Sequence, residues 1–263
     1  MTTVVVKLGG HALEATRDAS LLLDGLADDL LALRDAGDAI VLVHGGGPQI
    51  NALVASLGIE TTFVDGLRVT TDDILQCVVM GLSMVNATLV AELVQRGVPA
   101  VGLHGASLGL LTCTQRSNTL GAVGLNPVAD ATVLDVLLAQ GMIPIVAPYA
   151  ADSQGRLVNC NADAAAGAVA NALRADALLL LSDIDQVRLD STDPASAVAE
   201  LSSAQARNLL ATGAAKDGMK PKVQSALLAI DCGASRVVIG NGSHPHSVRN
   251  VLTRTVPVTE VTA

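Results

Sequence analysis

Asn159, Asn161 and Asp163 form the densest group of side chains that could bind a polar ligand. They alternate along a stretch expected to be extended, and the run of small residues at 164–172 that follows is typical of a closely packed helix. Unpaired N–H groups and the dipole at the start of such a helix favour anions. The stretch therefore predicts either an anion-binding corner or a plain helix start, with Asn161 as the N-cap and Asp163 as a first-turn charge.

Two glycine-rich loops follow strand-like runs and could present backbone amides to an anion. Residues 3–6 lead into Lys-Leu-Gly-Gly at 7–10, and residues 39–43 lead into His-Gly-Gly-Gly-Pro at 44–48. Either loop alone could be a tight strand-to-helix turn, but two on successive parallel strands favour an anion site. Neither loop matches a Walker A or dinucleotide fingerprint, so a nucleotide would have to bind in another way.

Two cationic side chains stand at positions that need an explanation. Arg68 lies in a predicted hairpin or lid at 61–70, where its planar fork suits a carboxylate, although a solvated surface arginine is the simpler alternative. Lys222 lies near the start of a predicted helix that runs to Ile230. The helix dipole disfavours a cation there, so a bound anion would account for it.

Strands that alternate with helices must position these groups. Polar residues also follow the apolar run 177–181 at Ser182 and Asp183, where open α/β sheets bind ligands. Residues 104–126 read as loops or short hairpins. The expected fold class is α/β, a three-layer sandwich with a central, mostly parallel sheet and one structural domain overall. Expected strands are 3–6, 39–43, 100–103, 143–147, 177–181 and 236–239. Expected helices include 21–33, 72–93, 133–138, 202–210, 246–253 and one that the residues 218–222 introduce and that runs to 230.

Composition excludes several classes of function. Phe63 and Tyr149 are the only aromatic residues and the net charge is −9, so the chain lacks the stacking and basic surfaces that bind nucleic acid. No stretch is expected to span a bilayer and no signal peptide is recognised, which predicts a cytoplasmic protein without a membrane partner. The four cysteines are far apart and are expected to be core thiols, and no metal ligand set is predicted.

Six motifs in order resemble the amino acid kinase family, and most closely its members that phosphorylate N-acetyl-L-glutamate. The similarity covers essentially the whole chain, and the span 120–170 matches nearly continuously. The resemblance implies the amino acid kinase fold and ATP-dependent formation of an acyl phosphate on the acceptor's side-chain carboxylate, on the arginine route. The motifs are Lys-Leu-Gly-Gly at 7–10, His-Gly-Gly-Gly at 44–47, Gly-Leu-Arg-Val-Thr at 66–70, Asn-Cys-Asn-Ala-Asp at 159–163, Ser-Asp at 182–183 and Gly-Met-Lys-Pro-Lys at 218–222.

The resemblance also implies roles for individual residues. Lys7 and Lys222 would supply positive charge to the transferring phosphoryl group, Gly10 and Gly46 would donate N–H groups to it, and Asp163 would hold both lysines in position. Mg²⁺ would bridge the ATP phosphates. The acceptor would be held by Gly46, Gly47, Arg68, Asn159 and Asn161, and the nucleotide by Ser182, Asp183, Ile184, Asp185, Val187, Ala214, Lys216 and Met219.

The resemblance extends to lobes and assembly. Residues 1–175 would form an N-terminal lobe that binds the acceptor and dimerises, and residues 176–263 a C-terminal lobe that binds ATP. No long helix precedes Thr3, from which we expect a homodimer rather than an arginine-inhibited hexamer. Gln186 stands where family members carry glycine, and the loop at 104–109 also departs from the family pattern. Alternative functions are phosphorylation of aminoadipate or glutamate on a carrier protein, and a non-catalytic ligand sensor.

Overall fold

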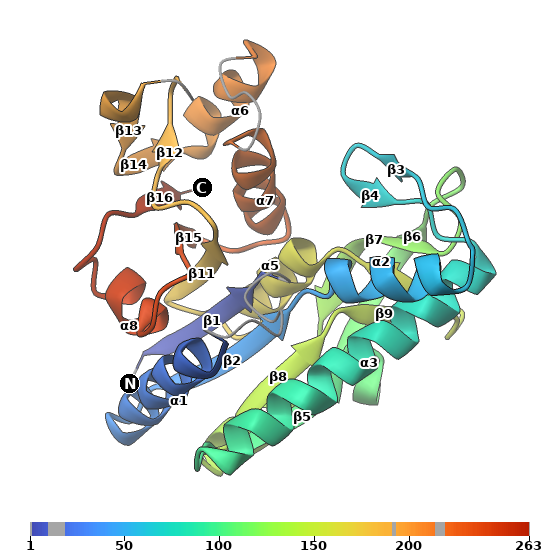
Figure 1. Ribbon diagram of the computed structural model, residues 1–263, viewed down its shortest axis with the longest axis horizontal. Coiled ribbons are helices and arrows are strands. Elements are labelled where there is room, and N and C mark those ends of the chain that lie inside the picture. The colour runs from blue at the N-terminus through green and yellow to red at the C-terminus, as the bar shows by residue number, and fades with distance from the viewer. Residues whose placement is uncertain (1, 10–18, 191–192, 214–218, 263) are drawn as a thin grey trace.

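All six predicted strands lie in one central sheet of eight strands (Figure 1). The computed structural model describes residues 2–9, 19–190, 193–213 and 219–262. Neighbouring strands are parallel except for the pair β15 and β16, as expected for a mostly parallel sheet. In spatial order the strands are β14 (Glu200–Ser202), β16 (Thr259–Thr262), β15 (Arg236–Asn241), β11 (Ala177–Ser182), β1 (Thr3–Leu8), β2 (Ala39–His44), β8 (Ile143–Ala147) and β5 (Ala100–His104).

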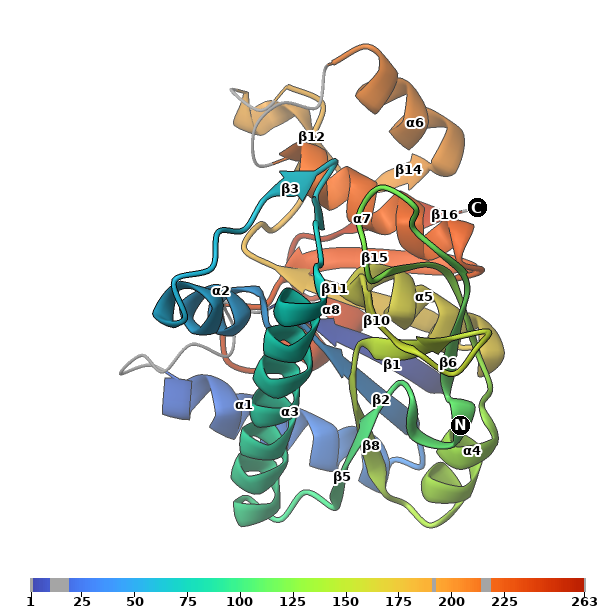
Figure 2. The ribbon, with the colours of Figure 1, turned by 90° about the vertical axis from the view of Figure 1, so that its right-hand side faces the viewer.

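Helices cover both faces of this sheet, which confirms the three-layer sandwich (Figures 1 and 2). Because successive residues of a strand point to opposite faces, Val4 and Val6 pack in one core and Val5 packs in the other. The first core includes side chains of α1 (Ala19–Asp35), α3 (Asp72–Gln95) and α8 (Ser247–Leu252). The second includes α4 (Thr132–Ala139), α5 (Ala162–Ala172), α6 (Ser203–Ala211) and α7 (Met219–Asp231).

Smaller elements lie near the carboxyl ends of the central strands, where the sequence motifs also lie. The predicted hairpin is present as β3 (Phe63–Val64) and β4 (Leu67–Arg68), and its turn residues Asp65 and Gly66 both have positive φ. The irregular region after β5 contains the antiparallel pair β6 (Leu111–Arg116) and β7 (Val123–Ala129), which closes into a four-stranded barrel with β9 (Tyr149–Asp152) and β10 (Leu157–Cys160). The remaining elements are α2 (Gly47–Ser56), β12 (Val187–Arg188), β13 (Ala197–Val198) and the short 3₁₀ turns Ser107–Gly109 and Pro194–Ser196.

Helices α5 and α7 pack unusually closely because both carry small residues at their contact. A Cβ atom on Gly167 would lie 2.5 Å from the carbonyl oxygen of Ala229, so this position requires glycine. The small-residue run thus brings the start of α5, with Asp163, next to the first turns of α7, with Lys222 and Ser225.

The expectation that no stretch could span a bilayer is wrong by length and composition. Helix α3 has 24 residues and is apolar enough to pass that test. The apolar residues of α3 serve the protein core, because α3 packs against α2, β5 and β8 and buries residues such as Val78 and Leu93.

Candidate active site

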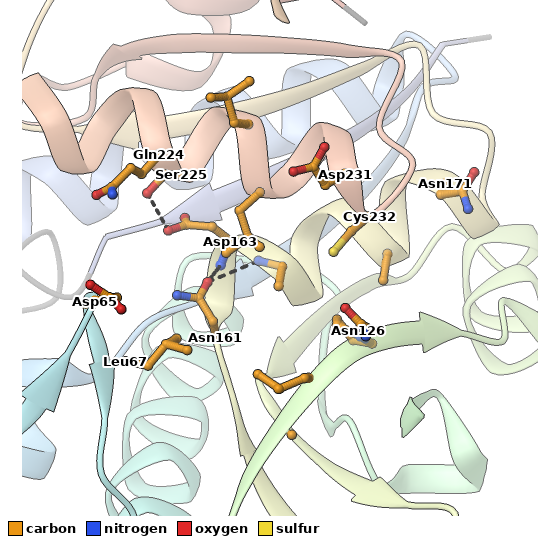
Figure 3. Close-up of a pocket in the computed structure, with 18 of the residues that line it drawn as sticks. Asp65, Leu67, Asn126, Asn161, Asp163, Asn171, Gln224, Ser225, Asp231 and Cys232 are labelled. Atoms are coloured by element: carbon orange, nitrogen blue, oxygen red, sulfur yellow. Dashed lines mark hydrogen bonds between the residues drawn. The ribbon is translucent and has the colours of Figure 1, made fainter. Parts of the chain in front are cut away.

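Asn161 is the N-cap of α5, as the plain helix-start interpretation predicted. Its side-chain oxygen accepts hydrogen bonds from the backbone N–H groups of Asp163, at 2.8 Å, and Ala164, at 3.1 Å (Figure 3). These bonds satisfy two of the donors that a helix start leaves unpaired. Asn161 also lines the acceptor pocket described below.

Asp163 is more than a first-turn charge, because it is buried between two elements from opposite ends of the chain. One carboxylate oxygen lies 2.9 Å from Lys7 Nζ at the end of β1, and the other accepts a hydrogen bond of 2.7 Å from Ser225 Oγ on α7. Burial alone would raise the pKa of Asp163, but the Lys7 charge, the Ser225 hydrogen bond and, more weakly, the Lys222 charge together lower it. The carboxylate is therefore ionised at neutral pH and holds Lys7 in place.

Lys222 does not pair with Asp163 as expected. Its Nζ lies 2.7 Å from Asp183 Oδ1, at the turn after β11. The two residues can pair because the first turn of α7 lies close to the carboxyl end of β11. Lys222 still contributes to lowering the pKa of Asp163, so its charge faces the same corner. The structure therefore gathers both lysines around the start of α5, with a separate carboxylate contact for each.

All five residues predicted to hold the acceptor line one cavity of about 170 Å³. The cavity lies between the 45–47 glycine loop, the β3–β4 hairpin and the approach to α5. Its lining includes Gly46, Gly47, Arg68, Asn159 and Asn161, together with Phe63, Leu82 and Cys160. We call it the acceptor pocket.

Arg68 is buried in this pocket, which excludes the surface-arginine alternative. Arg68 is only 7% exposed. Its guanidinium donates hydrogen bonds to Thr61 Oγ1 at 2.9 Å and to Asn51 Oδ1 at 2.7 Å. The guanidinium also lies 4.6 Å from the centre of the Phe63 ring, a cation–π contact. Burial lowers the pKa of Arg68 from its usual value, and among the described residues no carboxylate pairs with it. A carboxylate ligand would compensate this buried charge.

Arg68→Lys is expected to raise the KM for the acceptor by about tenfold or more, with a smaller change in kcat, because an ammonium cannot reproduce the bidentate fork. Arg34→Lys is the matched control, since Arg34 lies at the far end of α1 in an exposed pair with Asp35. Steady-state kinetics with varied acceptor measures both. An unchanged KM in Arg68→Lys would remove Arg68 from the acceptor pocket's function.

Four of the predicted nucleotide residues, Ser182 to Asp185, lie at the carboxyl end of β11 and in the turn that follows it. Ser182 Oγ accepts from the Ile184 N–H at 3.3 Å, and Asn241 donates to Asp185 at 3.0 Å. Val187 N–H donates to Thr259 Oγ1 at 2.9 Å, and Met219 is buried at the start of α7. Gly10, Ala214 and Lys216 lie outside the described residues.

The structure explains the glycine-to-glutamine departure at position 186. The Gln186 amide donates to the carbonyl of Val258 at 2.8 Å, which fastens the turn to the chain before β16. A glycine could not make this contact, so this chain holds the loop after β11 by a side chain.

Sequence reasoning missed two polar residues of this corner. Ser225 follows Lys222 by three positions, so both lie on one face of α7, a spacing that could have indicated it. Asn241 is the last residue of β15, lies between two glycines in the sequence and pairs with Ser182 of β11. That glycine-flanked position at a strand end was the available signal.

A larger groove of about 890 Å³ runs past Asp163 and Ser225 (Figure 3). It is bounded by the tip of the β3–β4 hairpin, β7, α5 and α7, and it shares Gly66, Leu67 and Asn161 with the acceptor pocket. Asp163, which pairs with Lys7, lines this groove two residues after Asn161, which lines both cavities. An arrangement of this kind can bring a bound carboxylate to a second anion, with lysine charge between them.

Comparison with known proteins identifies the class to which this fold and site belong. The model of the amino acid kinase family matches residues 2–241. The chain belongs to this family, and it is accordingly a kinase that uses ATP and acts on a small molecule.

Curated relatives narrow the class further. Acetylglutamate kinase of Ruegeria pomeroyi is 40% identical over 93% of this chain and 83% of its own length. Among solved structures, a Streptococcus mutans protein matches with a TM-score of 0.78 and 30% identity over 99% of this chain and 98% of that chain. N-acetylglutamate synthase of Neisseria gonorrhoeae, complexed with coenzyme A and N-acetyl-glutamate, matches with a TM-score of 0.78 and 26% identity. That match covers 100% of this chain and 59% of the synthase.

Proposed function

We propose that this protein transfers the γ-phosphoryl group of ATP to the side-chain carboxylate of N-acetyl-L-glutamate, an acyl-phosphate-forming step of arginine biosynthesis. The observation that carries the proposal is the acceptor pocket, where buried Arg68 lies in the same cavity as Gly46 and Asn159. The names of the curated relatives support the same substrate. A pocket lined by hydrogen-bonding groups rejects analogues that lack the matching atoms.

The physical difficulty of this reaction is the meeting of two anions. A carboxylate must attack a phosphoryl group whose oxygens already carry negative charge, so the site must supply positive charge and alignment rather than a covalent intermediate. Lys7 at the end of β1 and Lys222 in the first turn of α7 carry that charge. Gly46, and by resemblance Gly10, donate N–H groups to the transferring group. Asp163 positions Lys7 and is no general base, because the attacking carboxylate is already deprotonated at neutral pH.

The acceptor's other groups are held away from the reacting carboxylate. Arg68 and the amide of Gly47 bind the backbone carboxylate, and Asn159 with Asn161 binds the acetamide. Gly46 lines the same pocket, and its N–H serves the transferring phosphoryl group. Asn159 is itself oriented by donating to Thr70 Oγ1 at 3.1 Å. We assign the nucleotide to Ser182, Asp183, Ile184, Asp185, Val187 and Met219 and, by resemblance alone, to Ala214 and Lys216, which lie outside the described residues.

Mg²⁺ fits this site as a metal bound mainly by the nucleotide. Among the described residues no three metal-ligating side chains come together, and Asp163 is already paired with Lys7. Mg²⁺ is commonly held by one or two carboxylates and substrate phosphates, and Asp183 and Asp185, in the turn after β11, are the residues that would hold it. Bound Mg²⁺ would neutralise phosphate charge.

The two lobes divide this work within one structural domain. We assign the acceptor and the dimer contact to residues 1–175 and ATP to residues 176–263, in a cytoplasmic homodimer. The exposed face of α3 supports the dimer, because it carries Met80, Met84 and Val94 and no charge between Ile74 and Ala91. Sedimentation should give a dimer, and a monomer or hexamer would contradict this assignment.

A coupled assay of ADP release tests the proposed function. ATP and Mg²⁺ are supplied with N-acetyl-L-glutamate, L-glutamate, aminoadipate or a carrier-linked acid. We expect kcat/KM for N-acetyl-L-glutamate to exceed that for free glutamate by about 10³-fold or more, because the acetamide partners would be left unpaired. If the enzyme prefers a carrier-linked acid, that acid replaces N-acetyl-L-glutamate as the proposed substrate. If no acceptor is turned over, the result favours a ligand sensor.

A further inference from the structure

His44 is a completely buried titratable side chain that the proposed reaction does not use. It ends β2 immediately before the 45–47 glycine loop. Its Nδ1 lies 2.8 Å from the carbonyl oxygen of Gly45, and its Nε2 lies 3.1 Å from Asn86 Nδ2 on α3. The same amide nitrogen donates to the carbonyl of Ile145 on β8 at 2.9 Å. The ring thus joins the loop to a helix and a neighbouring strand.

These contacts fix which nitrogen of His44 carries the proton. The Asn86 atom facing the Ile145 carbonyl must be the nitrogen, because two oxygens would repel each other. The carbonyl oxygen of Leu103 also lies within reach of this nitrogen, at 3.4 Å, but His44 Nε2 is nearer, at 3.1 Å. Nε2 must be an acceptor here, because an amide nitrogen can only donate. Nδ1 therefore carries the proton and donates to Gly45. Burial lowers the pKa of His44 to about 4, although the hydrogen bond to Gly45 opposes the shift, so the ring is neutral at pH 7.

The hydrogen bond to Gly45 determines the direction of the next N–H group. In a planar trans peptide the carbonyl oxygen and the following N–H point in opposite directions. Because the Gly45 carbonyl turns toward buried His44, the Gly46 N–H turns away from the core. Gly46 lines the acceptor pocket, and within the described part of the chain its N–H donates to no backbone carbonyl.

We propose that His44 and Asn86 are positioning residues that aim the Gly46 N–H at the transferring phosphoryl group. This inference rests on the proposed function, since it assigns the direction of a donor in that reaction. Preorganised donors lower a barrier only when they already point at the developing charge. The role is one of orientation, because His44 is sealed from both solvent and the pocket by its neighbours.

Gly102 on β5 offers an independent way to disturb this arrangement. A Cβ atom at residue 102 would lie 2.3 Å from Asn86 Oδ1, so even alanine must displace the Asn86 amide. Gly102→Ala therefore perturbs His44 through Asn86 without altering any residue of the acceptor pocket.

His44→Asn and His44→Gln form a matched pair for the test. An asparagine amide can occupy the place of Nδ1 and keep the bond to Gly45, whereas a glutamine amide reaches toward the place of Nε2. We expect His44→Gln to lower kcat by about 100-fold with the acceptor KM within about threefold, and His44→Asn to retain at least about ten times the kcat of His44→Gln. Gly102→Ala should lower kcat in the same way as His44→Gln.

Nitrogen-15 NMR of the histidine-labelled full chain supplies a readout that does not depend on activity. It should report His44 protonated at Nδ1 and not at Nε2 at neutral pH. An Nε2 proton, or equal kcat in the two His44 variants with wild-type turnover intact, overturns the positioning role alone. Absence of wild-type turnover overturns the proposed function and this role with it. If both His44 variants unfold, Gly102→Ala and the spectrum decide.

Discussion

The Lys222→Met variant should lose about 10³-fold in kcat while its melting temperature stays within about 4 °C of the wild type. Phosphoryl transfer depends on positive charge at the transferring group, and single cations of this kind contribute factors of about 10³ or more. Folding depends on Lys222 far less. Its side chain is 26% exposed and pairs with Asp183, which is 69% exposed, and such pairs contribute about 1 kcal/mol or less. Steady-state kinetics and thermal unfolding of the same preparation test both statements.

Lys220→Met is the matched control for this prediction. Lys220 lies in the same first turn of α7 and is exposed, so the substitution removes the same charge from the same helix. Its kcat should stay within about threefold of the wild type. A loss of kcat below about tenfold in Lys222→Met, or an equal loss in both variants, would contradict a direct role for Lys222.

The Asp163→Asn variant should lose both activity and stability. The substitution leaves Lys7, whose side chain is 18% exposed, without its counter-charge. Breaking a buried pair by removing one partner costs about 3–5 kcal/mol, and the partial exposure of Lys7 reduces this to about 2–4 kcal/mol. We also expect kcat to fall by about 10²-fold or more, because the Lys7 ammonium is no longer held in place. Denaturant unfolding and kinetics measure the two losses.

The pH dependence of the stability loss gives a second test. The pKa of Asp163 is lower in the folded protein than in the unfolded chain, where it is about 3.9. The ionised carboxylate therefore stabilises the fold fully above about pH 5, and this contribution is lost as the pH falls through the folded pKa. The difference between wild type and Asp163→Asn should stay constant from pH 5 to 8 and shrink below pH 4. Asp35 lies in an exposed pair, so the free energy of unfolding of Asp35→Asn should differ little from that of the wild type at any of these pH values. A gap that widens in acid would contradict the ionised state of Asp163.

Local sequence patterns predicted the central sheet because burial on both faces produces continuous apolar runs. The run at 177–181 is such a case, and it forms β11 between β1 and β15. The same reasoning missed β16, where Thr-Glu-Val-Thr has alternating polarity and pairs antiparallel with β15, next to the edge strand β14. It also missed the closure of β6, β7, β9 and β10 into a barrel, because closure depends on pairings between distant segments.

The candidate site was likewise predictable in part from the sequence. Motif order indicated Lys7, Arg68, Asn159 and Asp163, and the structure brings the pocket residues together. The partners of these groups were not predictable from local sequence. Lys222 pairs with Asp183 rather than Asp163, and Ser225 reaches Asp163 only because α5 and α7 pack closely at Gly167. Side-chain pairing of this kind is set by tertiary packing.

The central claim is that Lys7 and Lys222 converge on one phosphoryl group beside the acceptor pocket. A structure of the full chain with a non-hydrolysable ATP analogue, Mg²⁺ and N-acetyl-L-glutamate measures this directly. We predict that Nζ of both lysines lies within about 4 Å of an oxygen of the γ-phosphoryl group, with Lys222 released from Asp183 and the acceptor's backbone carboxylate on Arg68. The account is contradicted if Lys222 stays paired with Asp183 while the nucleotide is bound, or if the acceptor lies outside the Arg68 pocket.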